Sequence, residues 1–281
     1  MRFSRLSLLP LALIAAAACH DDSVSVNTRP PLGGVRFVNA VPDGGPVDIR
    51  MVDQVEWSAN SVSDNTACCG LPFRGGTIHW ATEAKARHIR VFPTDSSLAV
   101  TTQILHDTTI TIEANKNITL MLVGSRAAGG KVSFVTIDDN PGAVPATQIA
   151  TRLVNAGSTA QPGSASGYIT ATASTPLPAS ATFPTVAPRS ASAYVLRNTG
   201  AFAFQATPAG DNTTIWAASS APTGAPADGL IGATAGATGG GSAFSAYLFP
   251  RSVAGTAAPQ SAAFQVPALV YFVDLVPAPP K

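Results

Sequence analysis

The most reactive side chains in this 281-residue chain belong to three cysteines, two of which are neighbours. Cys68 and Cys69 stand in the segment Thr66-Ala67-Cys68-Cys69-Gly70. Neighbours cannot form an ordinary disulfide, because their Cα atoms lie about 3.8 Å apart and a disulfide usually needs about 5.5 Å. Three states of the two cysteines remain open: a strained vicinal disulfide, an intermolecular disulfide and two free thiols. With no third cysteine or histidine close by in sequence, we favour a structural turn over a redox switch.

Histidine and serine are the other residues that could support catalysis. A metal site needs three or four donors around one ion, and the histidines, His20, His79, His88 and His106, are scattered along the sequence. Residues 147–281 are rich in serine but contain no histidine to act as a base. No Gly-x-Ser-x-Gly, P-loop, Rossmann or His-Glu-x-x-His pattern occurs. We therefore expect no enzyme, with no catalytic residue, no metal and no cofactor.

Three aspartates recur at intervals of five, at Asp43, Asp48 and Asp53. Carboxylates with glycines between them could hold calcium, but the chain has no Asp-x-Asp-x-Asp-Gly loop. We favour structural roles, in which Asp43 caps its own Pro-Asp-Gly turn and Asp48 stabilises a strand end.

Aromatic side chains could form a platform on which sugar rings stack. Aromatic residues in strands are more often part of a hydrophobic core, which is the interpretation we favour. The residues concerned are Trp57, Trp80, Trp216, Tyr194 and Tyr247.

The N-terminal segment has the charge-then-apolar order of a secretory signal, with Arg2 and Arg5 before the apolar run 6–18. This run of about 13 residues is shorter than the roughly 20 needed to span a bilayer. The sequence Ala-Ala-Ala before Cys19 resembles the lipobox of bacterial lipoproteins, although Ala16 stands where leucine is most usual. Ordinary cleavage after an A-x-A site, with Cys19 unmodified, is the alternative.

The lipobox resemblance implies that residues 1–18 are a signal peptide and that Cys19 carries the lipid. Residues 19–34 are polar, contain proline and glycine, and are expected to form a flexible tether. We expect a lipid-anchored protein of the bacterial cell envelope, whose membrane partner is reached through the N-terminal lipid. Because His20 and not an acid follows Cys19, we favour the outer membrane over the inner one.

Composition argues against nucleic-acid binding. Only 12% of the residues are charged, and the formal charge of +1 becomes −1 once Arg2 and Arg5 are removed. Binding to nucleic acid needs clustered lysine and arginine, which the chain lacks.

Hydrophobic residues alternate with polar ones from residue 35 onward, which is typical of short β-strands. Turns separate these strands every 8 to 12 residues or so, as in a β-sandwich. In the first half, strands are expected at 35–41, 47–53, 77–83, 88–94, 99–106, 108–113, 118–125 and 131–138. In the second half, they are expected at 167–173, 193–197, 201–207, 213–218, 242–249 and 262–276.

A short internal echo suggests two tandem domains. The sequence TRLVNA at 151–156 follows a linker-like segment and echoes VRFVNA at 35–40. We expect a first β-sandwich domain over 35–140 and a second, divergent one over 147–277.

The opening sequence VRFVNAVPD at 35–43, followed by PVDI at 46–49, resembles the start of the bacterial domain-of-unknown-function family 4397. The resemblance continues at 110–124, in ITIEANKNITLMLVG, and in the acidic turn at 138–140. It implies a secreted or surface protein with an immunoglobulin-like β-sandwich, and it brings no catalytic residues. Residues 158–281 lack the Pro-Asp and Val-Asp elements, so a degenerate copy and a different β domain both remain open.

Together these observations favour a non-enzymatic envelope lipoprotein that binds or adheres to an unknown protein or glycan. A carbohydrate-binding module, and an envelope redox or hydrolytic protein using Cys68 and Cys69, are the alternatives.

Overall fold

The computed structural model describes residues 30–53, 67–158, 162–225 and 233–277, without the side chains of 67–69. Cys19, Trp57, the expected signal peptide and most of the expected tether lie outside the described residues. Pro31–Lys281 form one compact unit. No helix in the described part of the chain is long and apolar enough to cross a membrane.

The first half of this unit is a sandwich of two four-stranded sheets, in the orders β4-β1-β7-β8 and β3-β2-β5-β6. Neighbouring strands are antiparallel, except that β1 and β7 run parallel. The elements are β1 (Leu32–Asn39), β2 (Val47–Met51), β3 (Ala67–Leu71), β4 (Trp80–Glu83), β5 (Ala86–Pro93), α1 (Leu98–Thr101), β6 (His106–Thr111), β7 (Asn117–Gly124) and β8 (Val132–Asp138).

The second half repeats this strand order. Its sheets are β12-β9-β16-β17, with β13 also paired to β9, and β11-β10-β14-β15. Strand β9 runs parallel to β16, as β1 does to β7, and β12 and β13 together take the place of β4. The elements are β9 (Gln148–Asn155), β10 (Ala165–Thr170), β11 (Phe183–Val186), β12 (Ser190–Ala191), β13 (Val195–Asn198), β14 (Ala203–Pro208), β15 (Ala217–Ser220), β16 (Ala243–Phe249), the 3-10 turn η1 (Ala262–Phe264) and β17 (Ala268–Leu275).

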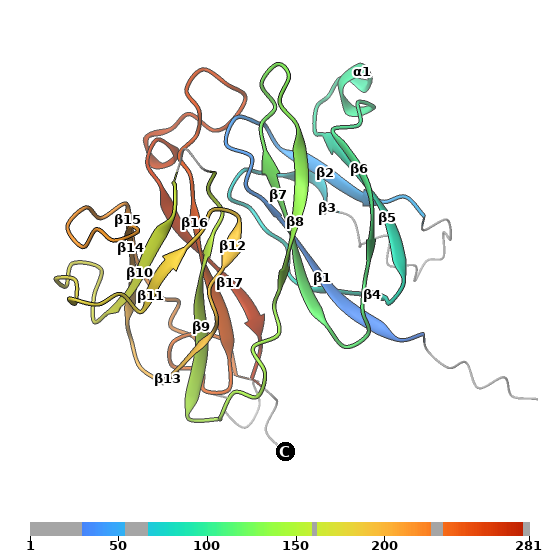
Figure 1. The fold of residues 1–281 in the computed structure, drawn as a ribbon. Helices are drawn as coiled ribbons and strands as arrows, with labels where there is room; N and C mark the ends of the chain where they lie inside the picture. The colour runs from blue at the N-terminus through green and yellow to red at the C-terminus, as the bar shows by residue number, and fades with distance from the viewer. Residues whose placement is uncertain (1–29, 54–66, 159–161, 226–232, 278–281) are drawn as a thin grey trace, which may run out of the picture. The chain divides into compact units, whose positions relative to one another are not determined.

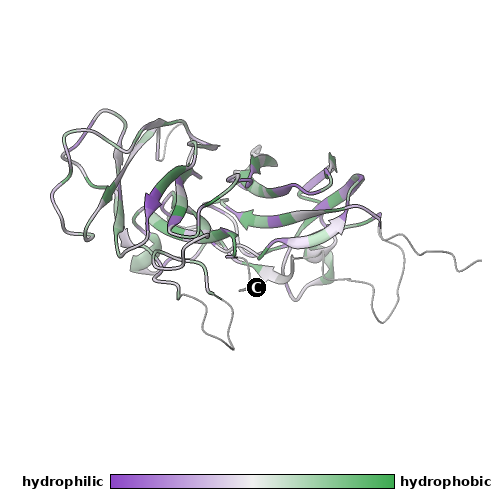
Figure 2. Cartoon of the chain, turned by 90° about the horizontal axis from the view of Figure 1, so that it is seen from below, coloured by the Kyte–Doolittle hydropathy of each residue, from purple (hydrophilic) through white to green (hydrophobic). Residues whose placement is uncertain are grey.

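Burial patterns show which sheets are internal. Strand β5 alternates between buried and partly exposed residues, because only one face of its sheet meets the first core. All seven residues of β16 are buried, as is most of β1 and β9. A further apolar cluster joins side chains of β1 and β7 to those of β9 and β16, so each inner sheet is covered on both faces. Figure 1 shows the two sandwiches adjacent, and Figure 2 shows hydrophobic and hydrophilic positions alternating along the strands.

A buried asparagine closes the same loop in each sandwich. Asn39 Nδ2 donates to Leu71 O at 3.1 Å, and its Oδ1 accepts from Val41 N at 3.1 Å. Asn155 makes the corresponding bonds, to Val186 O at 3.0 Å and from Gly157 N at 3.0 Å. These are the asparagines of the two echoed sequences, so the echo marks positions with the same structural role. Both amides are fully buried, which explains why both of their polar ends are paired.

The expected all-β, sandwich-like fold is confirmed. The strand order adds a difference from immunoglobulin constant-type domains, in which the first two strands pair in one sheet. Here β1 and β2 lie in opposite sheets, as do β9 and β10.

Some expectations about local secondary structure were wrong. Residues 32–34, expected to end the flexible tether, form the start of β1. The strand expected at 99–106 is largely replaced by the short helix α1, which follows a turn where Asp95 Oδ1 accepts from Ser97 N. Cys68 and Cys69 lie within strand β3 and not in a turn. The strand ends at Leu71, next to Gly70, whose φ of +92° favours glycine and whose N–H donates to Asp48.

Candidate functional site at the junction of the two sandwiches

The two facing sheets are joined by buried arginines. Arg36 lies on β1 of the first sandwich, and its side chain is 1% exposed. Its Nη2 donates to Asp274 Oδ1 at 2.6 Å, and its Nη1 donates to the carbonyl of Val273 at 2.9 Å. Both acceptors lie on β17 of the second sandwich. The guanidinium of one sandwich is therefore held by the last strand of the other.

An arginine of the second sandwich makes the corresponding contacts with the first. Arg152 on β9 donates from Nη2 to Asp139 Oδ1, and from Nη1 to Asp138 O at 2.6 Å. Each arginine thus binds an aspartate of the other sandwich together with the carbonyl of the residue before that aspartate. We call Arg36, Arg152, Asp139 and Asp274 the clasp.

Hydroxyl groups complete the clasp on both sides. Arg36 Nε donates to Thr119 Oγ1 at 2.8 Å, and Thr119 donates to Asp139 at 2.5 Å. Arg152 Nε donates to Ser245 Oγ at 2.7 Å, and Ser245 donates to Asp274 at 2.5 Å. The remaining carboxylate capacity is used by two different residue types, His79 Nε2 on Asp139 and Tyr194 OH on Asp274, both at 2.8 Å.

The surroundings of the clasp favour the charged forms of Asp139 and Arg36. Burial by itself would raise the pKa of Asp139, but the hydrogen bond from His79 and the charges of Arg36 and Arg152 hold it below its usual value. Burial would lower the pKa of Arg36, but the nearby carboxylates raise it above the ordinary range. Burial, together with Asp274, also raises the pKa of Tyr194. Asp139 and Arg36 therefore stay charged near neutral pH, and their ion pairs hold the two sandwiches together.

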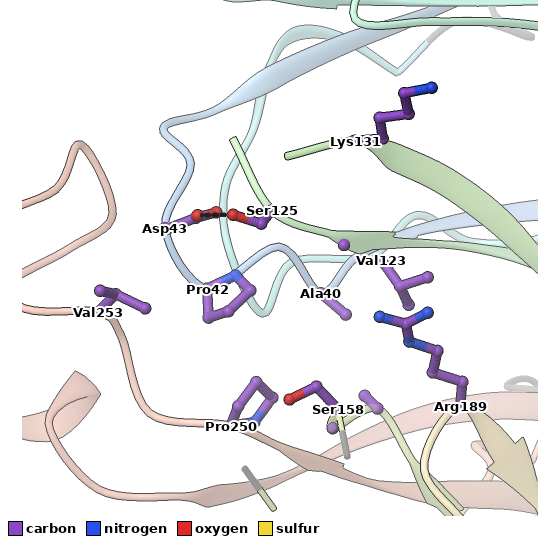
Figure 3. A pocket seen from close by; sticks show the side chains of 13 residues that line it. Ala40, Pro42, Asp43, Val123, Ser125, Lys131, Ser158, Arg189, Pro250 and Val253 are labelled. Atoms are coloured by element: carbon purple, nitrogen blue, oxygen red, sulfur yellow. Dashed lines mark hydrogen bonds between the residues drawn. The ribbon is translucent and has the colours of Figure 1, made fainter. Parts of the chain in front are cut away.

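Strands β1 and β9 both end at a pocket of about 320 Å³. This volume lies at the lower end of the range for small-molecule sites, about 300–1,000 Å³. Both sandwiches contribute to it, through the loops that follow β1, β7, β9, β11 and β16. Figure 3 shows the pocket, which is lined by Ala40, Pro42, Asp43, Val123, Gly124, Ser125, Lys131, Ala156, Gly157, Ser158, Arg189, Pro250 and Val253.

Asp43 closes one side of the pocket. The sequence had predicted that it caps its own turn, and this prediction was wrong. Its carboxylate accepts from Ser125 Oγ, from Arg126 N at 2.9 Å and from Ala127 N at 3.1 Å. It therefore fixes the loop between β7 and β8. Because several donors already occupy the carboxylate, Asp43 is poorly placed to hold a cation.

Arg189 lies on the opposite side of the pocket, and its side chain extends toward Val123 in Figure 3. No hydrogen bond or ion pair joins its guanidinium to another residue of the described chain. Its φ of +61° lies in the left-handed region, which residues other than glycine seldom adopt. Figure 3 also shows Lys131 at the rim, extending away from Arg189.

The other candidate residues are dispersed. His88 contacts Asp107 at 2.5 Å on the surface, and His106 packs edge-on against Phe134. Asp48 accepts from Gly70 N at 3.0 Å and from Thr94 Oγ1 at 2.8 Å, while Asp53 accepts from His88 N at 3.2 Å. Within the described ranges, no three histidine, cysteine, aspartate or glutamate side chains gather as a metal site would require.

The four described aromatic candidates do not share a surface. Trp80 packs against the first core and Trp216 against the second. Tyr247 is fully buried between the sandwiches, and Tyr194 stacks near Arg152, whose guanidinium carbon lies 4.2 Å from the ring centroid. These positions correspond to the core interpretation.

Comparison with known proteins identifies a domain family. The model of the family described as "Domain of unknown function (DUF4397)" matches residues 33–162. The chain carries a DUF4397 domain. The DUF4397 match covers the first sandwich and continues through β9, so it includes Asp139 and Arg152, which bind each other across the junction.

Two other comparisons add little to the DUF4397 match. No curated protein matches the chain. A leucine-rich repeat protein from Bacteroides thetaiotaomicron is similar over 68% of this chain and 24% of its own length, with 10% identity and a TM-score of 0.19. The chain thus spans about a quarter of that protein.

Sequence reasoning found the DUF4397 opening motif but missed what its arginine does. The signal was present, because Arg36 and Arg152 occupy the same place in the two echoed sequences. A charged residue at the same position of two echoed strand sequences, next to apolar residues in both, predicts a buried ionic partner. Cys19, the one site residue predicted from the sequence, lies outside the described residues.

Replacing Asp139 with asparagine should destabilise the junction strongly. The variant leaves Arg152 and Arg36 buried without that counter-charge, and such losses cost about 3–5 kcal/mol. Chemical denaturation monitored by tryptophan fluorescence would measure the change. Asp107→Asn, which removes an ion-paired carboxylate from the surface, is the matched control and should shift the midpoint far less. Equal shifts for the two variants would contradict the role given to the clasp.

Acid should weaken the clasp through the same carboxylate. Because folding lowers the pKa of Asp139, its contribution to stability is present above about pH 4, the ordinary aspartate range, and is lost as the pH falls below it. Denaturation midpoints measured from pH 7 to pH 3 should therefore fall more steeply for the wild type than for Asp139→Asn. Parallel curves for the two proteins would rule out this contribution.

Proposed function

We propose that this chain is a non-enzymatic binding protein of the bacterial cell envelope and that the junction pocket is its binding site. The observation that carries this proposal is the composition of the pocket wall. Five loops from two sandwiches form it, and the clasp holds those sandwiches in register through arginines in the middle of β1 and β9. A pocket whose walls are fixed before binding loses little conformational entropy when a ligand enters.

The chemistry of the wall supports binding and not turnover. The lining combines apolar groups, such as Val123, Pro250 and Val253, with the guanidinium of Arg189. Neither a histidine nor a cysteine is among the lining residues of the described chain. Ser125 already donates its hydroxyl to Asp43, and that carboxylate also accepts from the backbone amides of Arg126 and Ala127, so it holds a loop in place. Apolar walls with a few polar groups are typical of ligand sites.

The proposed location follows from the N-terminal sequence. The run of small residues before Cys19 supports lipid attachment at that cysteine, with the outer membrane as the favoured site. Two or more acyl chains would give a stable anchor, because a single chain binds a membrane only marginally. The pocket would then be presented to proteins, peptides or glycans of the envelope.

Filling the pocket should abolish ligand retention. Val253 is 46% exposed and lines the pocket, so Val253→Trp places an indole there without disturbing a core. Purified protein would be incubated with the low-molecular-mass fraction of an envelope extract, and co-eluting compounds would be identified by mass spectrometry. We expect compounds retained by the wild type to be lost from Val253→Trp.

The matched control for that variant is Ile215→Trp, which adds the same indole at a similarly exposed position away from the pocket. It should retain the same compounds as the wild type. Retention of nothing by the wild type, or of the same compounds by Val253→Trp, would contradict a binding role for this pocket.

Mass spectrometry of the native protein from membranes should show lipid at the N-terminus. We expect a mature chain that begins at Cys19 and carries a diacyl- or triacyl-glyceryl increment. The Cys19→Ala variant should lose that increment and leave the membrane fraction. An unmodified mature mass in the wild type would exclude the anchor while leaving the pocket to be tested separately.

A further inference from the structure

The two sandwiches hold an arginine at the same place, and the partners of these two arginines differ. Arg74 N donates to Asn39 O, and Arg189 N donates to Asn155 O, so each follows the same loop closure. Their φ values are +66° and +61°. Because both arginines adopt this unfavourable backbone conformation at equivalent positions, we infer that the conformation orients each side chain toward a binding partner.

For Arg74, the target is peptide backbone. Its Nη2 donates to Pro250 O at 2.7 Å and to Val266 O at 2.6 Å, and its Nη1 donates to Ala263 O at 3.0 Å. Its guanidinium carbon also lies 5.0 Å from the ring centroid of Phe264. All these acceptors belong to the loop of the other sandwich that connects β16 to β17. Pro250 is the first residue of this loop, and the others lie at and after the 3-10 turn η1.

For Arg189, the equivalent loop is too short to fill the same role. The connection from β7 to β8 is residues 125–131, whereas the connection from β16 to β17 is residues 250–267. The shorter loop is anchored on Asp43 instead and leaves Arg189 facing the pocket. The pocket beside Arg189 therefore lies at the position that corresponds to the one filled by the β16–β17 loop beside Arg74.

We propose that the pocket binds the C-terminal end of a polypeptide, with the terminal carboxylate paired to Arg189. This inference rests on the proposed binding function and names the class of ligand. The position of Arg74 supports this assignment, because there the equivalent guanidinium donates hydrogen bonds to the backbone carbonyls of a peptide turn.

Charge and shape select a carboxylate over other groups. An unpaired guanidinium offers parallel N–H donors that match a carboxylate, and such charge-assisted pairs are among the stronger hydrogen bonds. Asp43 does not compete, because it is held by Ser125 and two backbone amides. Val123, Ala156 and Val253 provide an apolar wall for a small terminal side chain. The pocket volume of about 320 Å³ suits a chain end better than a long segment.

The test compares N-acetyl-alanyl-alanyl-valine as the free acid with its C-terminal amide, titrated into the full mature chain and followed by NMR. The acid should bind saturably, and the amide and acetate should bind far more weakly. Arg189→Gln should weaken binding of the acid about ten- to hundredfold, the usual effect of losing a hydrogen bond to a charged group. Its thermal unfolding midpoint should stay unchanged, because the Arg189 side chain is exposed.

Arg189→Lys and Arg251→Gln separate geometry from charge. The first keeps the charge but loses the planar fork, so it should bind with intermediate affinity. The second removes an exposed cation that follows Pro250 but is not among the residues that line the pocket, so it should bind almost as well as the wild type. Equal losses for Arg189→Gln and Arg251→Gln would show a diffuse charge effect and overturn the proposal.

Three other results would also overturn the proposal: equal binding of acid and amide, equal binding of acetate and peptide acid, and no binding of the peptide acid. The second of these would identify a small free carboxylate as the ligand. If the wild type still retains envelope compounds and Val253→Trp loses them, the binding function stands and only the peptide assignment fails. If that retention is absent too, both fail.

Discussion

The reciprocal pairing of two arginines with two aspartates across the junction is the interaction on which the rest of this molecule depends. Arg36 and Asp139 are almost completely inaccessible to water, and the desolvation of such charges is offset only when their hydrogen bonds are complete. Here each guanidinium reaches a carboxylate of the other sandwich, a hydroxyl and a carbonyl, and Arg36 also reaches Asp139 of its own sandwich. This requirement fixes the register of one sandwich against the other, since a shift along either strand would leave several charged donors unpaired.

Apolar packing alone would specify the junction less sharply. The cluster between the inner sheets includes Val38, Met121, Val154 and Phe249, and side chains of this kind tolerate small displacements. The clasp does not tolerate them, because its two aspartates lie at fixed positions, Asp139 directly after β8 and Asp274 within β17. Directional bonds therefore set the geometry, and burial of apolar surface supplies the driving force.

Much of the fold could be predicted from the sequence, because period-2 patterning and glycine-rich turns are local signals. Strands β1, β5, β7 and β8 begin and end close to the expected residues. Strands β3 and β11 were missed, since Ala-Cys-Cys-Gly-Leu and Phe-Pro-Thr-Val carry no clear alternation. Arg36 and Asp274 are 238 residues apart, and Arg152 and Asp139, although only 13 apart, belong to different sandwiches, so local patterns carry no information about these pairings. The echoed arginines were visible, but no matching motif marks their partners, one directly after β8 and the other within β17.

The place where the family match ends has a practical meaning for dividing this chain. Residues 33–162 include β9, and β9 is an inner strand whose neighbours β12, β13 and β16 come later in the sequence. A polypeptide that stopped at residue 162 would expose a strand that is almost entirely buried in the intact protein, with both edges unpaired, which is a template for self-association. One that stopped before β9 would lose Arg152 and leave Asp139 without that counter-charge. The smallest piece of this protein that satisfies both its strand edges and its buried charges contains both sandwiches.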